Sequence, residues 1–160
     1  MPKDSILLLD DDLHILWTLK TFLEAEGYTI YTADTIDTFK RLGVEVGAST
    51  FITEYWVQNA QTLEVIQAFK EKFPEAYVMM ITNNQVTEEE YKEIIKAGVD
   101  DFFLKPFPNN KMLIHLEKGL RQRNLFLQNK RLEEEIIHMK QGSEISNPLG
   151  YGSAMNTPGT

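Results

Sequence analysis

Three consecutive acids, Asp10, Asp11 and Asp12, directly follow the aliphatic run of residues 6–9. A short, continuous aliphatic run is typical of a strand buried on both faces of a parallel sheet, so the acids would cluster at its carboxyl end. That edge binds ligands in open α/β sheets, and adjacent aspartates supply the oxygen ligands that Mg²⁺ prefers. The alternative is that the acids cap the helix expected over residues 13–25, because aspartate is favoured in a first helical turn.

Two further polar residues follow later apolar runs. Thr82 comes directly after residues 77–81, and Lys105 comes directly after residues 102–104. Each has an ordinary explanation on its own, because a threonine can cap a following helix and a lysine at a strand end can be a solvated charge. Their order along the chain favours a common polar site instead, since the carboxyl ends of parallel strands share one edge of the sheet.

Strand-like and helix-like segments alternate over most of the chain. Apolar residues three and four positions apart predict helices, and short β-rich runs predict strands. The expected strands are residues 6–9, 28–32, 49–53, 77–81 and 102–104, and the expected helices are residues 13–25, 35–42, 62–73, 87–97 and 110–140. Gly27, Pro74 and Gly98 mark the ends of three of these helices. This alternation predicts an α/β fold with a doubly wound, five-stranded parallel sheet.

Over residues 4–120 the order of these motifs resembles the receiver domain of two-component response regulators. The resemblance implies a flavodoxin-like receiver fold, an acidic pair at Asp10 and Asp11 that binds Mg²⁺, and a phosphate pocket formed by Thr82 and Lys105. Transfer of a phosphoryl group to a carboxylate requires such a set. The metal and the lysine offset the phosphate charge, and the hydroxyl donates to a phosphate oxygen.

The aspartate that accepts the phosphoryl group in this family, after the third strand, is replaced by Glu54 in this chain. The resemblance therefore implies a weak Mg²⁺ site formed by Asp10, Asp11, Glu54 and the backbone carbonyl of Trp56. Glutamate has the charge of aspartate but one more methylene, which displaces its carboxylate by about 1 Å. Misplacement of that size can cost about 100-fold in a positioned reaction, so phosphorylation at Glu54 is disfavoured.

The loop after Glu54 also departs from the family. Residues 57–62 lack the Met-Pro pair and the glycine that receivers usually carry there. An engineered exchange of aspartate for glutamate would leave this loop in its family form, so the sequence favours a naturally atypical receiver, or pseudo-receiver. Glu54 carries one negative charge where an aspartyl phosphate carries nearly two, so any imitation of the phosphorylated state would be partial. We expect Glu54 to lie near Lys105, where it either fixes one conformation or fills the pocket.

Phe102, three residues before Lys105, stands where receivers carry an aromatic side chain whose inward rotation accompanies activation. Phenylalanine has no hydroxyl group and should favour the buried position. The resemblance implies a role for Phe102 as the switch aromatic, and ordinary core packing explains the residue equally well.

Residues 110–140 are dense in Leu, Glu, Lys, Gln and Arg, which favours one long helix. A heptad pattern with one asparagine runs through its second half, at Leu125, Asn129, Leu132, Ile136 and Met139. Such a seam predicts a coiled-coil homodimer, and a solvated amphipathic helix is the alternative. We therefore expect a receiver domain over residues 1–120, a helical extension over 121–140 and a disordered tail over 141–160, which is rich in Gly, Ser, Asn and Pro.

Composition excludes several other classes of function. The chain of 160 residues has no cysteine, which excludes disulfides, thiolate metal sites and a cysteine nucleophile. A net charge of −8 argues against direct binding to nucleic acid or to an anionic membrane. The aliphatic run of residues 6–9 is too short for a signal peptide or a membrane span, so we expect a cytoplasmic protein.

The sequence as a whole predicts an atypical response regulator receiver in two-component phosphorelay signalling. It would be a regulatory protein-interaction and dimerisation module rather than an enzyme, with a sensor histidine kinase or another signalling protein as its partner. One alternative is a phosphorylatable receiver that controls an effector absent from this chain. Another is a structural dimerisation module in which the receiver fold acts as a spacer.

Overall fold

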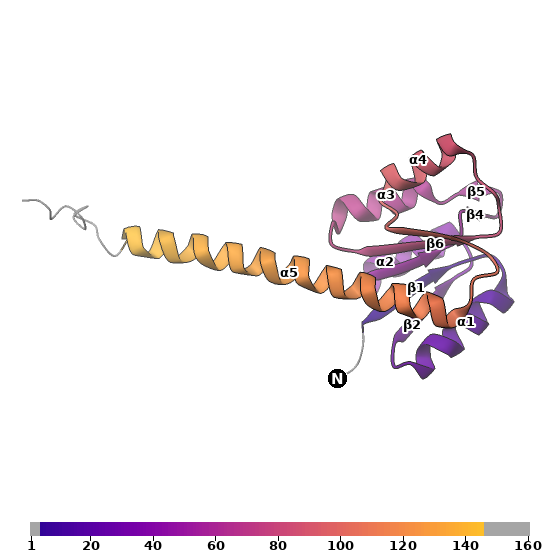
Figure 1. The fold of residues 1–160 in the computed structure, drawn as a ribbon, viewed down its shortest axis with the longest axis horizontal. Coiled ribbons are helices and arrows are strands. Elements are labelled where there is room, and N and C mark those ends of the chain that lie inside the picture. Colours follow the sequence, from indigo (N-terminus) through magenta and orange to yellow (C-terminus); the bar gives the residue numbers. More distant parts are fainter. Residues whose placement is uncertain (1–3, 146–160) are drawn as a thin grey trace, which may run out of the picture. The chain divides into compact units, whose positions relative to one another are not determined.

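The computed structural model describes residues 4–145, and its elements alternate as the sequence predicts (Figure 1). The main sheet contains β1 (Ser5–Leu9), β2 (Thr29–Ala33), β3 (Thr50–Thr53), β6 (Tyr77–Thr82) and β7 (Asp101–Leu104). The helices are α1 (Leu13–Ala25), α2 (Ile36–Glu45), α3 (Leu63–Lys72), α4 (Glu88–Ala97) and α5 (Asn109–Ile145). The sheet has the order β2-β1-β3-β6-β7 and every pairing in it is parallel. The predicted doubly wound, five-stranded parallel sheet is therefore confirmed.

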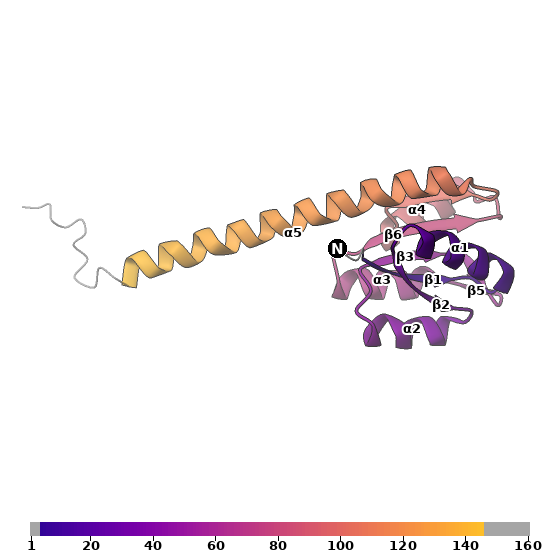
Figure 2. The same cartoon turned by 90° about the horizontal axis from the view of Figure 1, so that it is seen from below.

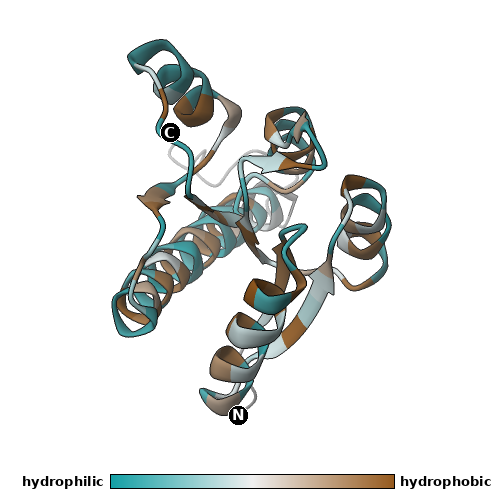
Figure 3. Cartoon of the chain, turned by 90° about the vertical axis from the view of Figure 1, so that its right-hand side faces the viewer, coloured by the Kyte–Doolittle hydropathy of each residue, from teal (hydrophilic) through white to brown (hydrophobic). Residues whose placement is uncertain are grey.

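Side chains of the parallel strands alternate between two apolar layers. One layer joins the sheet to α2, α3 and α4 and includes Leu7, Leu9, Phe39, Phe51, Ile66, Phe69, Met80 and Ile94. The other layer joins the sheet to α1 and the first part of α5 and includes Ile6, Leu8, Leu16, Leu23, Ile52, Met79, Met112 and Leu116. Figure 2 shows α2 and α3 on one side of the sheet and α1 on the other. In Figure 3 the surrounding helices carry both apolar and hydrophilic residues, as expected for helices that cover a sheet on one face only.

Short polar motifs begin and end several helices. The Asp12 side chain accepts hydrogen bonds from the backbone N–H groups of His14 and Ile15 and so caps α1. Thr87 and Glu90 form a reciprocal capping box at the start of α4. Gly98 then ends α4 with φ = 106°, a left-handed conformation that glycine adopts at little cost.

The loop after β3 contains a small hairpin that the sequence did not indicate. β4 (Trp56–Val57) pairs antiparallel with β5 (Ala60–Gln61). The two residues between these strands, Gln58 and Asn59, have φ values of 51° and 64°. Positive φ at both central positions is characteristic of the tight turns that join two-residue hairpins. This hairpin lies in the loop whose sequence departs from the family pattern.

α5 is longer than predicted and continues through Gly119 to Ile145. The predicted disordered tail therefore starts too early, because residues 141–145 are helical, and residues 146–160 lie outside the described part of the chain. Contacts within the chain define one compact unit, Met1–Arg123, and a second unit that begins at Asn124. The proposed domain boundaries at residues 120 and 140 stay predictions.

Candidate functional site

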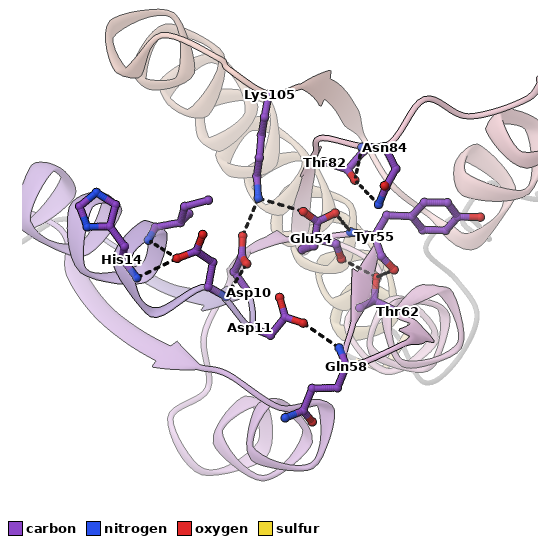
Figure 4. A network of polar contacts seen from close by, with 12 residues as sticks. Asp10, Asp11, His14, Glu54, Tyr55, Gln58, Thr62, Thr82, Asn84 and Lys105 are labelled. Atoms are coloured by element: carbon purple, nitrogen blue, oxygen red, sulfur yellow. Dashed lines mark hydrogen bonds and ion pairs between the residues drawn. The ribbon is translucent and has the colours of Figure 1, made fainter.

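The ends of three strands bring Asp10, Glu54 and Lys105 together (Figure 4). Asp10 follows β1, Glu54 follows β3, and Lys105 follows β7. The Lys105 Nζ atom donates to Asp10 Oδ2 at 2.7 Å and to Glu54 Oε2 at 2.9 Å. The parallel sheet thus collects one cation and two anions that are far apart in the sequence.

All three charged groups are largely removed from water. The exposed fraction of Asp10 is 6% and that of Glu54 is 5%. Burial raises the pKa of Asp10, and the hydrogen bond from Lys105 opposes that rise. Burial acts to lower the pKa of Lys105, but its hydrogen bonds to Asp10 and Glu54 outweigh burial and raise the pKa above its ordinary value. The lysine is therefore held in its charged form.

The second oxygen of each buried carboxylate also has a partner. Glu54 Oε1 accepts a hydrogen bond from the Tyr55 backbone N–H at 2.6 Å. Asp10 Oδ1 accepts from the Asp12 backbone N–H at 2.9 Å. Each carboxylate is thus oriented by one bond to the backbone and one to Lys105.

Asp11 makes a different contact from its neighbours. Its side chain is exposed, and Oδ2 accepts a hydrogen bond from the Gln58 backbone N–H at 2.8 Å. That bond connects the loop after β1 to the turn of the β4–β5 hairpin. The capping explanation for the acidic run therefore applies to Asp12 alone, whereas Asp10 contacts Lys105 and Asp11 contacts the hairpin.

Thr82 is fully buried at the end of β6, but its hydroxyl does not take part in the ion-pair cluster among the described contacts. The hydroxyl oxygen accepts from the Asn84 backbone N–H at 3.2 Å and from Asn84 Nδ2 at 3.4 Å. The Thr82 carbonyl accepts from the Lys105 backbone N–H at 2.7 Å, which joins the two loops through the main chain. Thr82 does not cap the following helix, because that role belongs to Thr87.

Phe102 is half-buried in β7 and packs against the apolar layer that α2, α3 and α4 cover. Its ring meets the ring of Tyr91 edge to face, with 5.8 Å between centroids and 85° between planes. This contact agrees with the core-packing explanation, and the switch role of Phe102 stays a prediction.

Little in the sequence indicates the residues in the following loop that contact Glu54 and Tyr55. The Thr62 hydroxyl is buried and donates to the Glu54 carbonyl at 2.8 Å. Tyr55 is also buried, and its hydroxyl accepts from Gln61 Nε2 at 3.1 Å. The position of Thr62 before a helix suggests a cap, yet its side chain makes no cap hydrogen bond to α3.

The acidic cluster offers carboxylate oxygens, the donor type that Mg²⁺ prefers. Within residues 4–145, no group of three or more His, Cys, Asp or Glu side chains is placed to hold a metal ion. Lys105 supplies the positive charge between Asp10 and Glu54 instead. Magnesium binding by Asp10, Asp11, Glu54 and the Trp56 carbonyl stays a prediction.

Comparison with known proteins identifies the fold. The sequence model of the response regulator receiver domain matches residues 6–117. The chain belongs to this family. Receiver domains are the signal-accepting modules of two-component systems, so the chain is a two-component signalling receiver. Along the described residues, no helix combines the length and the apolar character that a membrane crossing requires.

The relatives are longer proteins. The chain is 27% identical over 139 residues to a putative NtrX-like response regulator of Rickettsia typhi, covering 86% of this chain and 29% of that protein. It is 26% identical over 120 residues to the transcriptional regulatory protein ResD of Bacillus subtilis, covering 75% of this chain and 49% of that protein. The chain thus spans less than half the length of these two relatives.

Two solved structures agree with the fold of this receiver. NtrX from Brucella abortus has a TM-score of 0.73 at 25% identity, over 82% of this chain and 30% of that one. The beryllofluoride-activated NtrC4 receiver domain dimer has a TM-score of 0.69 at 25% identity, over 74% of this chain and 98% of that one.

Proposed function

We propose that this receiver is atypical: Glu54 replaces the phosphoacceptor aspartate, and the protein regulates partners without ordinary aspartate phosphorylation. The observation that carries the proposal is the buried ion-pair cluster in which Lys105 bridges Asp10 and Glu54. This cluster offsets the charge of the pocket from within the chain. A receiver of this kind presents one stable surface to its partners.

Glu54 is a poor acceptor for a phosphoryl group because both of its oxygens are engaged. One oxygen accepts from Lys105 and the other from the Tyr55 backbone N–H. Attack on a phosphodonor would weaken one of these bonds in a largely buried pocket. The extra methylene also displaces the carboxylate by about 1 Å, which adds a penalty of about 100-fold for a positioned reaction.

Glu54 also differs from an aspartyl phosphate in its charge and in its number of acceptor oxygens. It carries one negative charge, whereas a phosphorylated side chain carries nearly two and adds three acceptor oxygens. The Thr82 hydroxyl accepts a hydrogen bond from Asn84, so Glu54 is bound by Lys105 and not by Thr82. Glu54 therefore engages the lysine of the phosphate pocket and leaves the threonine unused.

The partner class we propose is a sensor histidine kinase or another protein of the same signalling pathway, because response regulators pair with histidine kinases. The chain resembles an NtrX-like response regulator and the transcriptional regulator ResD over part of their length. An effector of that kind would lie outside the 160 residues of this chain.

We further propose that the protein forms a parallel homodimer through the later part of α5. Large apolar side chains on this part are about half exposed or more, at Leu125, Leu132, Ile136 and Met139. With Asn129 they occupy alternating three- and four-residue steps, which is the spacing of a coiled-coil seam with one polar residue to set the register. In that register Glu135 of one chain would face Lys140 of the other, a favourable pair at the edges of the seam.

The test of the atypical receiver is treatment with acetyl phosphate and excess Mg²⁺, followed by intact mass measurement. We expect this chain to gain no phosphoryl group and Glu54→Asp to gain one. The matched control is Glu64→Asp, the same exchange at an exposed position in the first turn of α3, which should behave like the unaltered chain.

Two outcomes would contradict the proposal. A phosphoryl group on the unaltered chain would show that the pocket still accepts phosphate. A failure of Glu54→Asp to gain one would show that Glu54 is not what silences the pocket.

A further inference from the structure

A cavity of about 420 Å³ lies beside the ion-pair cluster, between α1, the carboxyl ends of the strands and the start of α5. Its apolar wall includes Leu8, Ile15, Leu19, Ile52, Phe107 and Met112. Binding sites for small molecules typically have volumes of roughly 300–1,000 Å³ and are lined mainly by apolar side chains with a few polar groups. The volume is that of roughly 14 water molecules at about 30 Å³ each, so it can hold a small organic molecule.

The polar end of the cavity carries a negative charge. The titratable residues among those that line it are Asp10, Glu54, Lys105 and His14. In the ion-pair cluster two carboxylates face one ammonium group, so these three groups together carry a single net negative charge. A buried charge of this kind favours a ligand of opposite sign.

The two carboxylates also retain capacity to accept hydrogen bonds. An ionised carboxylate offers about four acceptor sites. Asp10 accepts from Lys105 and Asp12, and Glu54 accepts from Lys105 and Tyr55. About half of the acceptor capacity of each carboxylate is therefore unused by the described residues, at the polar end of an otherwise apolar cavity.

We propose that this cavity binds a small amphiphile that has an apolar body and a single cationic head, such as a primary ammonium or an amidinium. The body would occupy the apolar space between α1 and α5. The head would donate to Asp10 and Glu54 alongside Lys105 and bring the charge of the site to zero. Such a ligand would contact the ion-pair cluster directly, and its binding does not depend on whether the receiver can be phosphorylated.

The experiment compares three probes of similar size that differ in the charge of the head: phenylbutylammonium, phenylbutanol and phenylbutanoate. Each is titrated into the full chain at pH 8 with EDTA present, so that no divalent metal competes. Dissociation constants come from calorimetry, and backbone amide NMR shifts locate the bound probe.

We expect the ammonium to bind about tenfold or more tightly than the alcohol, because a hydrogen bond to a charged group is stronger than one between neutral groups. The carboxylate should bind weakest. Amide shifts should concentrate on α1 and the first turns of α5, which line the cavity. In Glu54→Gln the advantage of the ammonium over the alcohol should fall to about threefold or less, because that exchange removes one negative charge and leaves the apolar wall intact.

The proposal is overturned if no probe binds at millimolar concentration, if the carboxylate binds as well as the ammonium, or if the amide shifts lie elsewhere. It is equally overturned if Glu54→Gln retains the full preference for the ammonium, since the preference would then come from general attraction to an acidic protein. A second variant, Ile15→Trp, enlarges a half-buried side chain in the cavity wall and should weaken all three probes alike.

Discussion

The pocket at the strand ends and the later part of α5 differ in how their side chains are satisfied. In the pocket, the buried charges of Asp10, Glu54 and Lys105 find partners within the same chain. On the later part of α5, large apolar side chains such as Leu132 and Ile136 stay exposed. In the first region Lys105 pairs with both carboxylates inside a single chain, whereas the second region has apolar surface that a second copy could cover. Regulation and assembly would therefore depend on separate kinds of interaction in this protein.

The largest expected effect comes from removing the cation of the pocket. Lys105→Met leaves two buried carboxylates without their shared cation, and breaking a buried pair in this way costs roughly 3–5 kcal/mol. The free energy of unfolding, measured with urea at pH 7, should fall by about that amount. Lys92→Met is the matched control, because Lys92 pairs with Glu88 on the exposed face of α4 and should cost less than about 1 kcal/mol. Similar losses of unfolding free energy in the two variants would mean that the buried ion pairs of Lys105 do not stabilise the fold more than an exposed pair does.

A second variant tests the assembly region. Ile136→Asp places a charge in the proposed seam and should weaken dimerisation by roughly 10- to 100-fold in analytical ultracentrifugation, without loss of helix content. Its neighbour Ile137 is a matched control, since it is the same residue type, 55% exposed against 52%, and lies outside the seam. Ile137→Asp should leave the dimer nearly unchanged. Equal effects of the two variants would argue against this seam.

A third prediction concerns alkaline pH. Tyr77 donates to Asp101, and burial together with this bond raises its pKa above the ordinary value of 10.0. Above pH 10 the unfolded chain loses the tyrosine proton while the folded chain keeps it. The unfolded state therefore binds fewer protons than the folded state, and the free energy of unfolding falls as pH rises. The contribution is about 1.4 kcal/mol per pH unit. In Tyr77→Phe, the loss of unfolding free energy between pH 10 and pH 11 should be smaller by about 1 kcal/mol, since the unfolded tyrosine is only half ionised at pH 10, and an unchanged loss would contradict the assignment.

The smallest effect concerns the hairpin. Asp11→Ala removes the acceptor for the Gln58 N–H, an exposed hydrogen bond worth roughly 1 kcal/mol. The Gln58 amide should then exchange its hydrogen about fivefold faster, as measured by NMR. The Val78 amide, which donates to Asp100 on another part of the sheet, serves as the control in the same sample and should be unaffected. Unaltered exchange at Gln58 would show that the hairpin is held by other contacts.

Much of this architecture was predictable because it depends on local patterns. Alternating apolar runs and helical periodicities identified the five strands of the main sheet, and α1 was predicted with the bounds that the structure has. The family resemblance then placed Asp10, Glu54 and Lys105 in one site, and the two carboxylates lie 2.7 and 2.9 Å from the Lys105 ammonium. Residues that directly follow parallel strands meet at the same edge of the sheet, which is why such sites are predictable.

Other contacts were not predictable because they depend on tertiary structure. The β4–β5 hairpin contains no glycine at its turn, so Asn59 was the single weak signal of positive φ there and Gln58 gave none. The choice of Asn84 as the partner of Thr82 depends on the course of a loop. α5 runs through Gly119 although glycine weakens helices. A Cβ atom there would lie 2.3 Å from the Tyr77 ring, so close packing explains the residue.

The run of Asp10, Asp11 and Asp12 has a consequence for how this protein tolerates change. Three identical neighbours suggest that one could replace another, yet each holds a different part of the chain: the lysine, the hairpin and the first turn of α1. The three side chains are chemically identical but make three different contacts. Deleting any one of the three gives the same chain, in which two aspartates must make the contacts of three, so this deletion should do more damage than any one substitution in the run.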